Sequence, residues 1–125
     1  MSLIHPQAEQ IDLAQVMAAL GDPTRLAIVG YLALYGEDAM SCGQFCPLGS
    51  KTGLTYHIAK LREAGVVRVE PSGTRRLISL RRADLDSRFP GLLDSILAAA
   101  VKNLPSPKPP PTLQASTALD QPVGH

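Results

Sequence analysis

Five side chains that can donate hydrogen bonds are clustered between residues 51 and 60. They share one face of a predicted helix and are Lys51, Thr52, Thr55, Tyr56 and Lys60. Ammonium and hydroxyl groups in this arrangement can bond to phosphate oxygens and to base edges, and a single helix is narrow enough to enter the major groove of a DNA duplex. The alternative is a solvated polar face on an ordinary surface helix.

The residues around these donors predict the helix that carries them. Leu54, Ile58 and Leu61 recur at helical spacing and form one apolar stripe. Ser50 suits the start of the helix, because its hydroxyl can accept from a free backbone N–H, and we include it among the candidate DNA-binding residues. Gly65 suits the end, where the chain must turn left-handed.

The positive charge of the chain is concentrated around this helix. Residues 1–49 hold one basic and five acidic residues, residues 50–82 eight basic and two acidic, and residues 83–125 three basic and four acidic. The three segments therefore carry net charges of −4, +6 and −1, within a chain whose net charge is only +1. Such clustering is typical of a protein with a polyanionic partner.

Two helices are expected upstream. Apolar positions in residues 11–20 recur at helical period, and Gly21 ends that helix. Asp22 and Pro23 then suit the N-cap and first position of a second helix. This second helix is apolar on nearly all sides, which indicates a central, buried position.

A helix-turn-helix unit and a hairpin are expected next. Residues 40–46 should form a short third helix, and residues 47–49 the turn before the candidate recognition helix. Strands at 66–70 and 75–80, joined by a turn at 71–74, should form a two-stranded hairpin. Its tip would present Ser72, Thr74, Arg75 and Arg76. Such a wing can grip phosphates or enter the minor groove, although charges on a hairpin edge can also serve only to prevent aggregation.

The C-terminal part divides into a helix and a tail. Residues 83–86 suggest a loop or single turn, and a helix can start at Pro90 and continue to Leu104. Its apolar stripe is wider than so small a domain needs, which favours contact with a second copy over packing within the monomer. Residues 105–125 hold six of the eleven prolines and are expected to be disordered or polyproline-like.

Composition limits the class of protein. A chain of 125 residues with 45% apolar content fits one domain, here residues 11–104 after a flexible segment at 1–10. No apolar run has the length of a membrane span, and the N-terminus lacks the features of a signal peptide. We therefore expect a cytoplasmic protein with no membrane partner, no cofactor and reduced cysteines.

The assembled order of elements predicts a mainly α-helical chain with a small β-hairpin, as in a winged helix-turn-helix (α-α-α-α-β-β-α). With its elements in this order, the chain resembles the ArsR/SmtB family of transcriptional repressors. The similar segments are ALGDPTRL at 19–26, YHIAKLREAGVV at 56–67 and GTRRLISL at 73–80. The resemblance implies a homodimer formed through the first and last helices. It also implies binding to an imperfect inverted repeat in double-stranded DNA, and repression that an inducer or stress signal relieves.

The resemblance also suggests roles for single residues. Lys51, Thr52, Thr55 and Tyr56 match groove-facing positions of the family. We expect Lys60 to contact phosphate instead. His57 matches the family histidine, and we expect it to be packed or bonded to backbone rather than to bind a ligand. Gly53 departs from the family's usual Ser or Thr, which costs about 1 kcal/mol of helix propensity but permits close approach to DNA.

Cys42 and Cys46 are four residues apart and can lie on one helical face. Three interpretations stay open: small buried apolar residues, a thiol sensor, or ligands of a soft metal that has a third ligand from elsewhere. In the family pattern the usual thiolate ligand falls at Gly43, and the last helix here has no histidine, so we predict no metal site of the family type.

Two other functions remain as alternatives to a DNA-binding regulator. One is a winged-helix protein-interaction module that does not use DNA. The other is a thiol enzyme built on Cys42 and Cys46, which we consider unfavoured because no base is evident nearby. The operator sequence, the inducer, the regulated genes and the choice between repressor and activator are not determined by the sequence.

Overall fold

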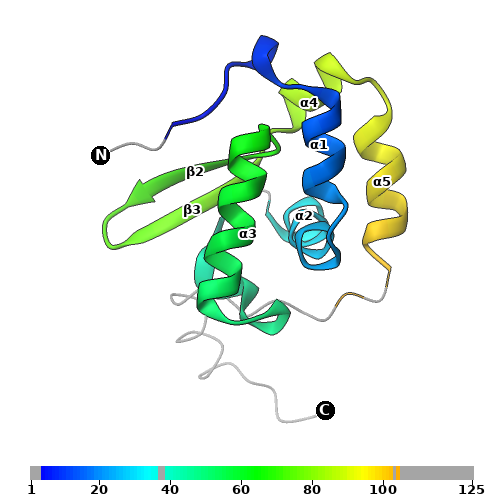
Figure 1. Cartoon of the computed structure of the whole chain (residues 1–125). Coiled ribbons are helices and arrows are strands. Elements are labelled where there is room, and N and C mark those ends of the chain that lie inside the picture. Colours follow the sequence, from blue (N-terminus) through cyan, green and yellow to red (C-terminus); the bar gives the residue numbers. More distant parts are fainter. Residues whose placement is uncertain (1–3, 37–38, 103, 105–125) are drawn as a thin grey trace.

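The fold is known from a computed structural model, which describes residues 4–36, 39–102 and 104. In chain order its elements are the 3-10 helix η1 (Ala8–Gln10), α1 (Leu13–Leu20), α2 (Pro23–Tyr35), β1 (Met40–Ser41), the 3-10 helix η2 (Cys42–Leu48), α3 (Lys51–Ala64), β2 (Val67–Ser72), β3 (Arg75–Leu80), α4 (Arg82–Arg88) and α5 (Leu92–Ala100). The predicted mainly helical winged helix-turn-helix is confirmed (Figure 1). The tail predicted for residues 105–125 lies outside the described residues.

The sheet has one strand more than the sequence predicted. β2 and β3 form the expected antiparallel hairpin, with Val67 opposite Leu80 and Ser72 opposite Arg75. β1 pairs with the other edge of β3, where Met40 lies opposite Ile78. The prediction of a two-stranded hairpin was therefore incomplete, because the pairing joins segments that are far apart in sequence.

The third helix also differs from its prediction. It begins at Cys42 rather than Met40, is a 3-10 helix, and continues through Pro47 to Leu48. Its start is set by Ser41, whose backbone N–H donates to Gln44 Oε1 at 2.9 Å. Met40 is fully buried because it belongs to the sheet. Residues 47–49 are thus not a free turn, and Gly49 alone separates this helix from the cap of α3.

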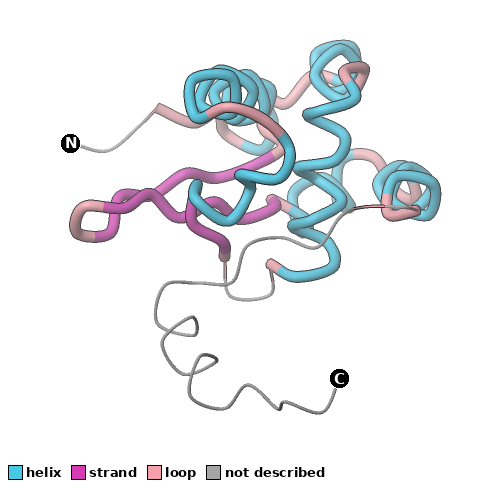
Figure 2. Tube along the Cα trace, turned by 90° about the horizontal axis from the view of Figure 1, so that it is seen from below, coloured by secondary structure: helices cyan, strands magenta, loops and turns pink. Residues whose placement is uncertain are grey.

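Helix α2 forms the centre of the fold, as its apolar sequence predicted. Ile28, Val29 and Tyr31 are completely buried, and the ring of Tyr31 stacks on that of Phe45 from η2 with centroids 6.0 Å apart. Asp22 and Pro23 occupy the predicted cap and first position of this helix. Figure 2 shows α2 crossing the middle of the molecule, with the other helices around it and the hairpin extending to one side.

The chain after the sheet contains two helices. Arg82–Arg88 forms α4, so the expectation of a loop or single turn at 83–86 was wrong: Leu85 is buried, and Arg82 and Asp86 form an ion pair at 3.5 Å. The last helix begins after Gly91 rather than at Pro90, and Leu93, Leu97 and Ala100 are buried. The core of one chain therefore covers much of the apolar stripe that favoured a second copy.

The N-terminal segment contacts the sheet and α4. His5 Nε2 accepts from the backbone N–H of Val69 at 3.0 Å, and Arg81 Nη1 donates to the carbonyl of Pro6 at 2.8 Å. Arg88 donates to the carbonyls of Glu9 and Ile11. The sequence predicted flexibility for residues 1–10, and the contacts of the described part, residues 4–10, were not foreseen.

The start of α1 also differs from its prediction. Helix α1 begins at Leu13, two residues later than expected, because the Asp12 carboxylate accepts from the N–H of Gln15 at 3.1 Å. Ile11, just before it, is buried against Gly65. No helix in the described part of the chain is long and apolar enough to span a membrane.

Candidate nucleic-acid interface

Helix α3 has the boundaries and the buried face that the sequence predicted. Ser50 Oγ accepts from the N–H of Gly53 at 3.1 Å, which caps the first turn. Gly65 ends the helix with φ +87°. A side chain at that position would be strained, and it would also collide with Ile11, whose Cγ1 lies 2.6 Å from the position of an added Cβ. Leu54, Ile58, Leu61 and Ala64 form the buried stripe.

The opposite face of α3 is exposed and carries all five predicted donors, namely Lys51, Thr52, Thr55, Tyr56 and Lys60. Tyr56 is 56% exposed, and Lys60 Nζ lies over its ring, 5.5 Å from the centroid. Thr55 Oγ1 donates to the carbonyl of Lys51 at 2.9 Å, so its hydroxyl hydrogen is already used. Thr55 can therefore offer lone pairs and a methyl group to a partner, rather than the donor that the sequence suggested.

The hairpin places its cations at a tip that is fully exposed. Figure 1 shows it extending beyond α3, on the side away from α5. Gly73 and Thr74 form a two-residue loop, and Gly73 has φ +64°, a conformation that glycine adopts without strain. Arg75 and Arg76 are exposed and, among the described residues, form no ion pair. Their guanidinium groups are thus available to an external anion.

The two cysteines lie on η2, directly before α3. Cys42 is half-buried, and burial raises the pKa of its thiol, whereas Cys46 is exposed. No group of three or more His, Cys, Asp or Glu side chains in the described residues is arranged to hold a metal ion. The structure thus gives the two thiols different environments, and within the described residues it gathers no third ligand around them.

A polar cluster that the sequence did not indicate joins α3 to the start of α2. Arg25 Nη1 lies 3.0 Å from His57 Nδ1, and Asp22 Oδ2 lies 3.7 Å from the same nitrogen. Asp22 also accepts from the N–H groups of Thr24 and Arg25. The bond from the Arg25 N–H is the main reason that the pKa of Asp22 is lowered. His57 is thus bonded to a side chain rather than to backbone, and all three residues fall in the segments of family resemblance.

The sequence of the chain is similar to those of known helix-turn-helix proteins. A family model described as a helix-turn-helix domain matches residues 20–70. The chain is also 35% identical over 86 residues to an uncharacterized HTH-type transcriptional regulator, YceK, of Bacillus subtilis (strain 168). That alignment covers 66% of this chain and 84% of the relative. The chain belongs to the helix-turn-helix transcriptional regulators.

The protein is therefore a DNA-binding transcriptional regulator. The matched range begins at the end of α1 and ends within β2, so it contains every predicted donor of α3. The tip of the hairpin lies just beyond it, and the role of Arg75 and Arg76 depends on their exposure and charge alone.

Proposed function

We propose that this regulator is an ArsR-type dimeric repressor. It binds an imperfect inverted repeat in double-stranded DNA through α3 and the hairpin, and an inducer or stress signal releases it. The observation that carries the proposal is the exposed donor face of α3. The buried stripe on the other side of the helix turns this face outward, and the exposed Arg75 and Arg76 of the hairpin add positive charge beside it. We propose that the protein acts in the cytoplasm.

The roles of the binding residues follow from their positions. The α3 side chains Lys51, Thr52, Thr55 and Tyr56 contact the major groove, with Ser50 at the entry of the helix. Lys60 and the tip residues Thr74, Arg75 and Arg76 contact the phosphate backbone or the minor groove. Hydrogen bonds to phosphate supply affinity for any sequence, whereas contacts to base edges supply selectivity.

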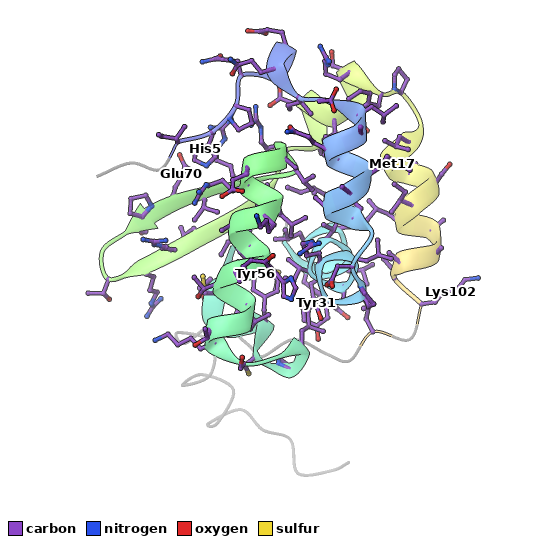
Figure 3. All side chains as sticks on the ribbon, in the orientation of Figure 1. His5, Met17, Tyr31, Tyr56, Glu70 and Lys102 are labelled. Atoms are coloured by element: carbon purple, nitrogen blue, oxygen red, sulfur yellow. The ribbon has the colours of Figure 1, made fainter. Side chains whose placement is uncertain are left out.

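Apolar exposure supports the dimer. Leu13 and Met17 are one turn apart on α1 and are 46% and 51% exposed. Figure 3 labels Met17, and α1 lies between α3 and α5 in this view. On α5, Leu92 and Ile96 are only half-buried. A two-fold interface through α1 and α5 would cover these groups and place two copies of α3 about 34–36 Å apart, one turn of the duplex.

We propose a thiol signal as the form of induction. Cys46 is exposed on η2, and η2 packs against α3. Oxidation there would disturb the element that precedes the recognition helix. Operator affinity measured with and without peroxide should fall only in proteins that retain the thiols, and equal affinity in wild type, Cys42→Ser and Cys46→Ser would exclude this signal.

DNA binding is tested with duplexes from the region upstream of the protein's own gene. We expect footprints on two half-sites that face the same side of the DNA. Affinity should fall by several orders of magnitude from 50 to 200 mM salt, and a scrambled duplex should bind more weakly. A protein that ignores duplex DNA at low salt would instead be the interaction module.

The dimer is tested by light scattering on two matched variants. Met17→Asp places a charge on the exposed face of α1 and should yield monomers with weakened operator binding. Leu34→Asp changes an apolar residue of equal exposure, 51%, at the end of α2, and should leave the dimer intact. A monomeric wild type, or equal effects of the two variants, would contradict the α1–α5 interface.

A further inference from the structure

Arg25 connects three helices at one point. Its Nε donates to the carbonyl of Ala19, at the end of α1, at 2.6 Å. Its backbone N–H belongs to the cap of α2 and donates to Asp22. Its Nη1 reaches His57 on α3. Since a guanidinium group has five donors in a fixed planar fork, these bonds define the position of α3 relative to the two other helices.

The bond to His57 requires one form of the imidazole ring. Arginine has no acceptor, so His57 Nδ1 must accept the hydrogen from Arg25 Nη1. This bond therefore needs the tautomer of the imidazole ring whose hydrogen is on Nε2. His57 is therefore an acceptor that receives a directed bond, and a purely apolar side chain of similar size cannot replace it.

His57 also touches the face that we assign to base contacts. The ring of Tyr56 lies edge-on to that of His57, with centroids 5.4 Å apart, and Lys60 Nζ lies over the Tyr56 ring. A sequence of contacts thus runs from Arg25 through His57 to two exposed side chains of α3. Any rotation of α3 that moves Tyr56 must break or bend the bond between Arg25 and His57.

Apolar packing leaves this rotation incompletely fixed. The buried stripe of α3 provides non-directional contacts. Between α1 and α3 there is also a hollow of about 210 Å³ beside Arg25, lined on α3 by Lys60, Glu63 and Ala64. The lining side chains leave this hollow open to the surface, so apolar contacts do not hold α3 there, and the directional bond of Arg25 at its edge has more influence on the orientation of the helix.

We propose that Arg25 and His57 are positioning residues for base selection. They hold α3 at the rotation that presents Tyr56 and Thr55 to the base edges, and they contribute little to the attraction between protein and phosphate. This inference rests on the proposed function, since it assumes that α3 reads the operator.

The main test compares selectivity in four variants. His57→Leu removes the acceptor, and His57→Asn keeps an oxygen near the place of Nδ1. Arg25→Lys keeps the charge but replaces the planar fork, which reaches Ala19 from Nε and His57 from Nη1, by a single nitrogen. Arg88→Lys is the matched control, because the Arg88 guanidinium group likewise bonds to two acceptors, here the carbonyls of Glu9 and Ile11, and neither acceptor belongs to α3. The measured quantity is the ratio of operator affinity to scrambled-duplex affinity, together with the salt dependence and the melting temperature.

We expect His57→Leu and Arg25→Lys to lower the ratio by roughly tenfold or more, with non-specific affinity and its salt dependence unchanged. His57→Asn should recover most of the ratio, and Arg88→Lys should keep the wild-type ratio even where it lowers the melting temperature. If His57→Leu does not fold, Arg25→Lys carries the comparison with Arg88→Lys.

Two results would overturn the inference alone. The first is a wild type that selects the operator together with variants that select it equally well while melting lower, which is the behaviour of a merely structural bond. The second is a nitrogen NMR spectrum that places the ring hydrogen of His57 on Nδ1. A wild type that does not select the operator would overturn the proposed function and this inference together.

Discussion

Helix α3 and the β2–β3 hairpin both present cations to solvent, but the fold holds them differently. α3 is capped by Ser50, ended by Gly65 and joined to α2 through Arg25 and His57. The hairpin is buried only at its base, where Val67, Val69 and Ile78 are inaccessible. Side chains on a rigid element suit selection among bases, which depends on angle and distance. Side chains at an exposed tip suit attraction to phosphate, which depends mainly on charge.

The largest effect on stability is expected from a substitution in the buried apolar stripe of α3. Leu61 is 0% exposed, so Leu61→Ala should lower the free energy of unfolding by about 2–5 kcal/mol and abolish operator binding at temperatures where the protein then unfolds. Denaturant titration measures this. Thr52→Ala, on the exposed face of the same helix, should change stability by no more than about 0.5 kcal/mol. Equal effects would mean that the stripe does not hold the helix.

The next effect concerns the hairpin. Replacing both Arg75 and Arg76 by Ala should weaken binding to every duplex, and the slope of log affinity against log salt should fall by about 2. Lys102→Ala is the control, because this exposed cation follows α5 at the other end of the molecule (Figure 3). If the double variant and the control share one salt slope, the hairpin does not contact phosphate.

A smaller and different effect is expected from the exposed face of α3. Tyr56→Ala should cost about 1–3 kcal/mol of discrimination at one or two base pairs and leave the salt slope unchanged. Thr55→Ala should act in the same way at a neighbouring base pair. Binding to a panel of singly substituted operators measures both. A uniform loss across the panel would show that these side chains supply affinity rather than selectivity.

Gly73 in the hairpin and Gly53 in α3 differ in backbone conformation. Gly73→Ala should destabilise the hairpin by about 1 kcal/mol because of its positive φ. A steric clash does not contribute, because an added Cβ would meet nothing within 4 Å. Gly53→Ala, inside α3, should instead stabilise the protein by less than about 1 kcal/mol. The added Cβ there lies 3.2 Å from Ser50 Oγ, which offsets part of the gain. Thermal melts of the two variants should therefore shift in opposite directions, and shifts of the same sign would contradict the backbone argument.

The smallest effect is a pH dependence at the N-cap of α2, next to the bond between Arg25 and His57. The pKa of Asp22 is lowered from its ordinary value of 3.8, chiefly by the backbone N–H of Arg25. A lowered pKa means that Asp22 contributes stability above pH 3.8 and loses it as the pH falls through the folded value. Asp22→Asn keeps an acceptor for the cap, so its stability should vary less with pH in this acid range. Identical acid profiles would show that the charge of Asp22 makes no contribution.

The features that the sequence predicted correctly depend on near neighbours. The stripe, the cap at Ser50 and the left-handed Gly65 together define α3 within sixteen residues, and all three were confirmed. The two hairpin strands were likewise recognisable from local residue types. The turn predicted at 71–74 is shorter, because Pro71 and Ser72 pair with Arg76 and Arg75 and leave only Gly73 and Thr74 in the loop. The prediction that residues 83–86 form a loop or single turn failed for the opposite reason. Helix α4 is held by Leu85, which is buried in the core, and by contacts of Arg81 and Arg88 with the N-terminal segment.

Residues 50–65 are enough to specify a capped amphipathic helix with a donor face, because helical periodicity and end signals act over a few residues. The contacts that attach this helix to the rest of the domain depend on the complete fold. The bond between Arg25 and His57 spans 32 positions in the sequence. The pairing of Met40 with Ile78 joins the segment before α3 to a strand after it. The burial of α5 against α2 likewise depends on residues from both ends of the domain. Such contacts have no periodicity in the sequence, since they form only when the folded backbone brings distant side chains within bonding distance.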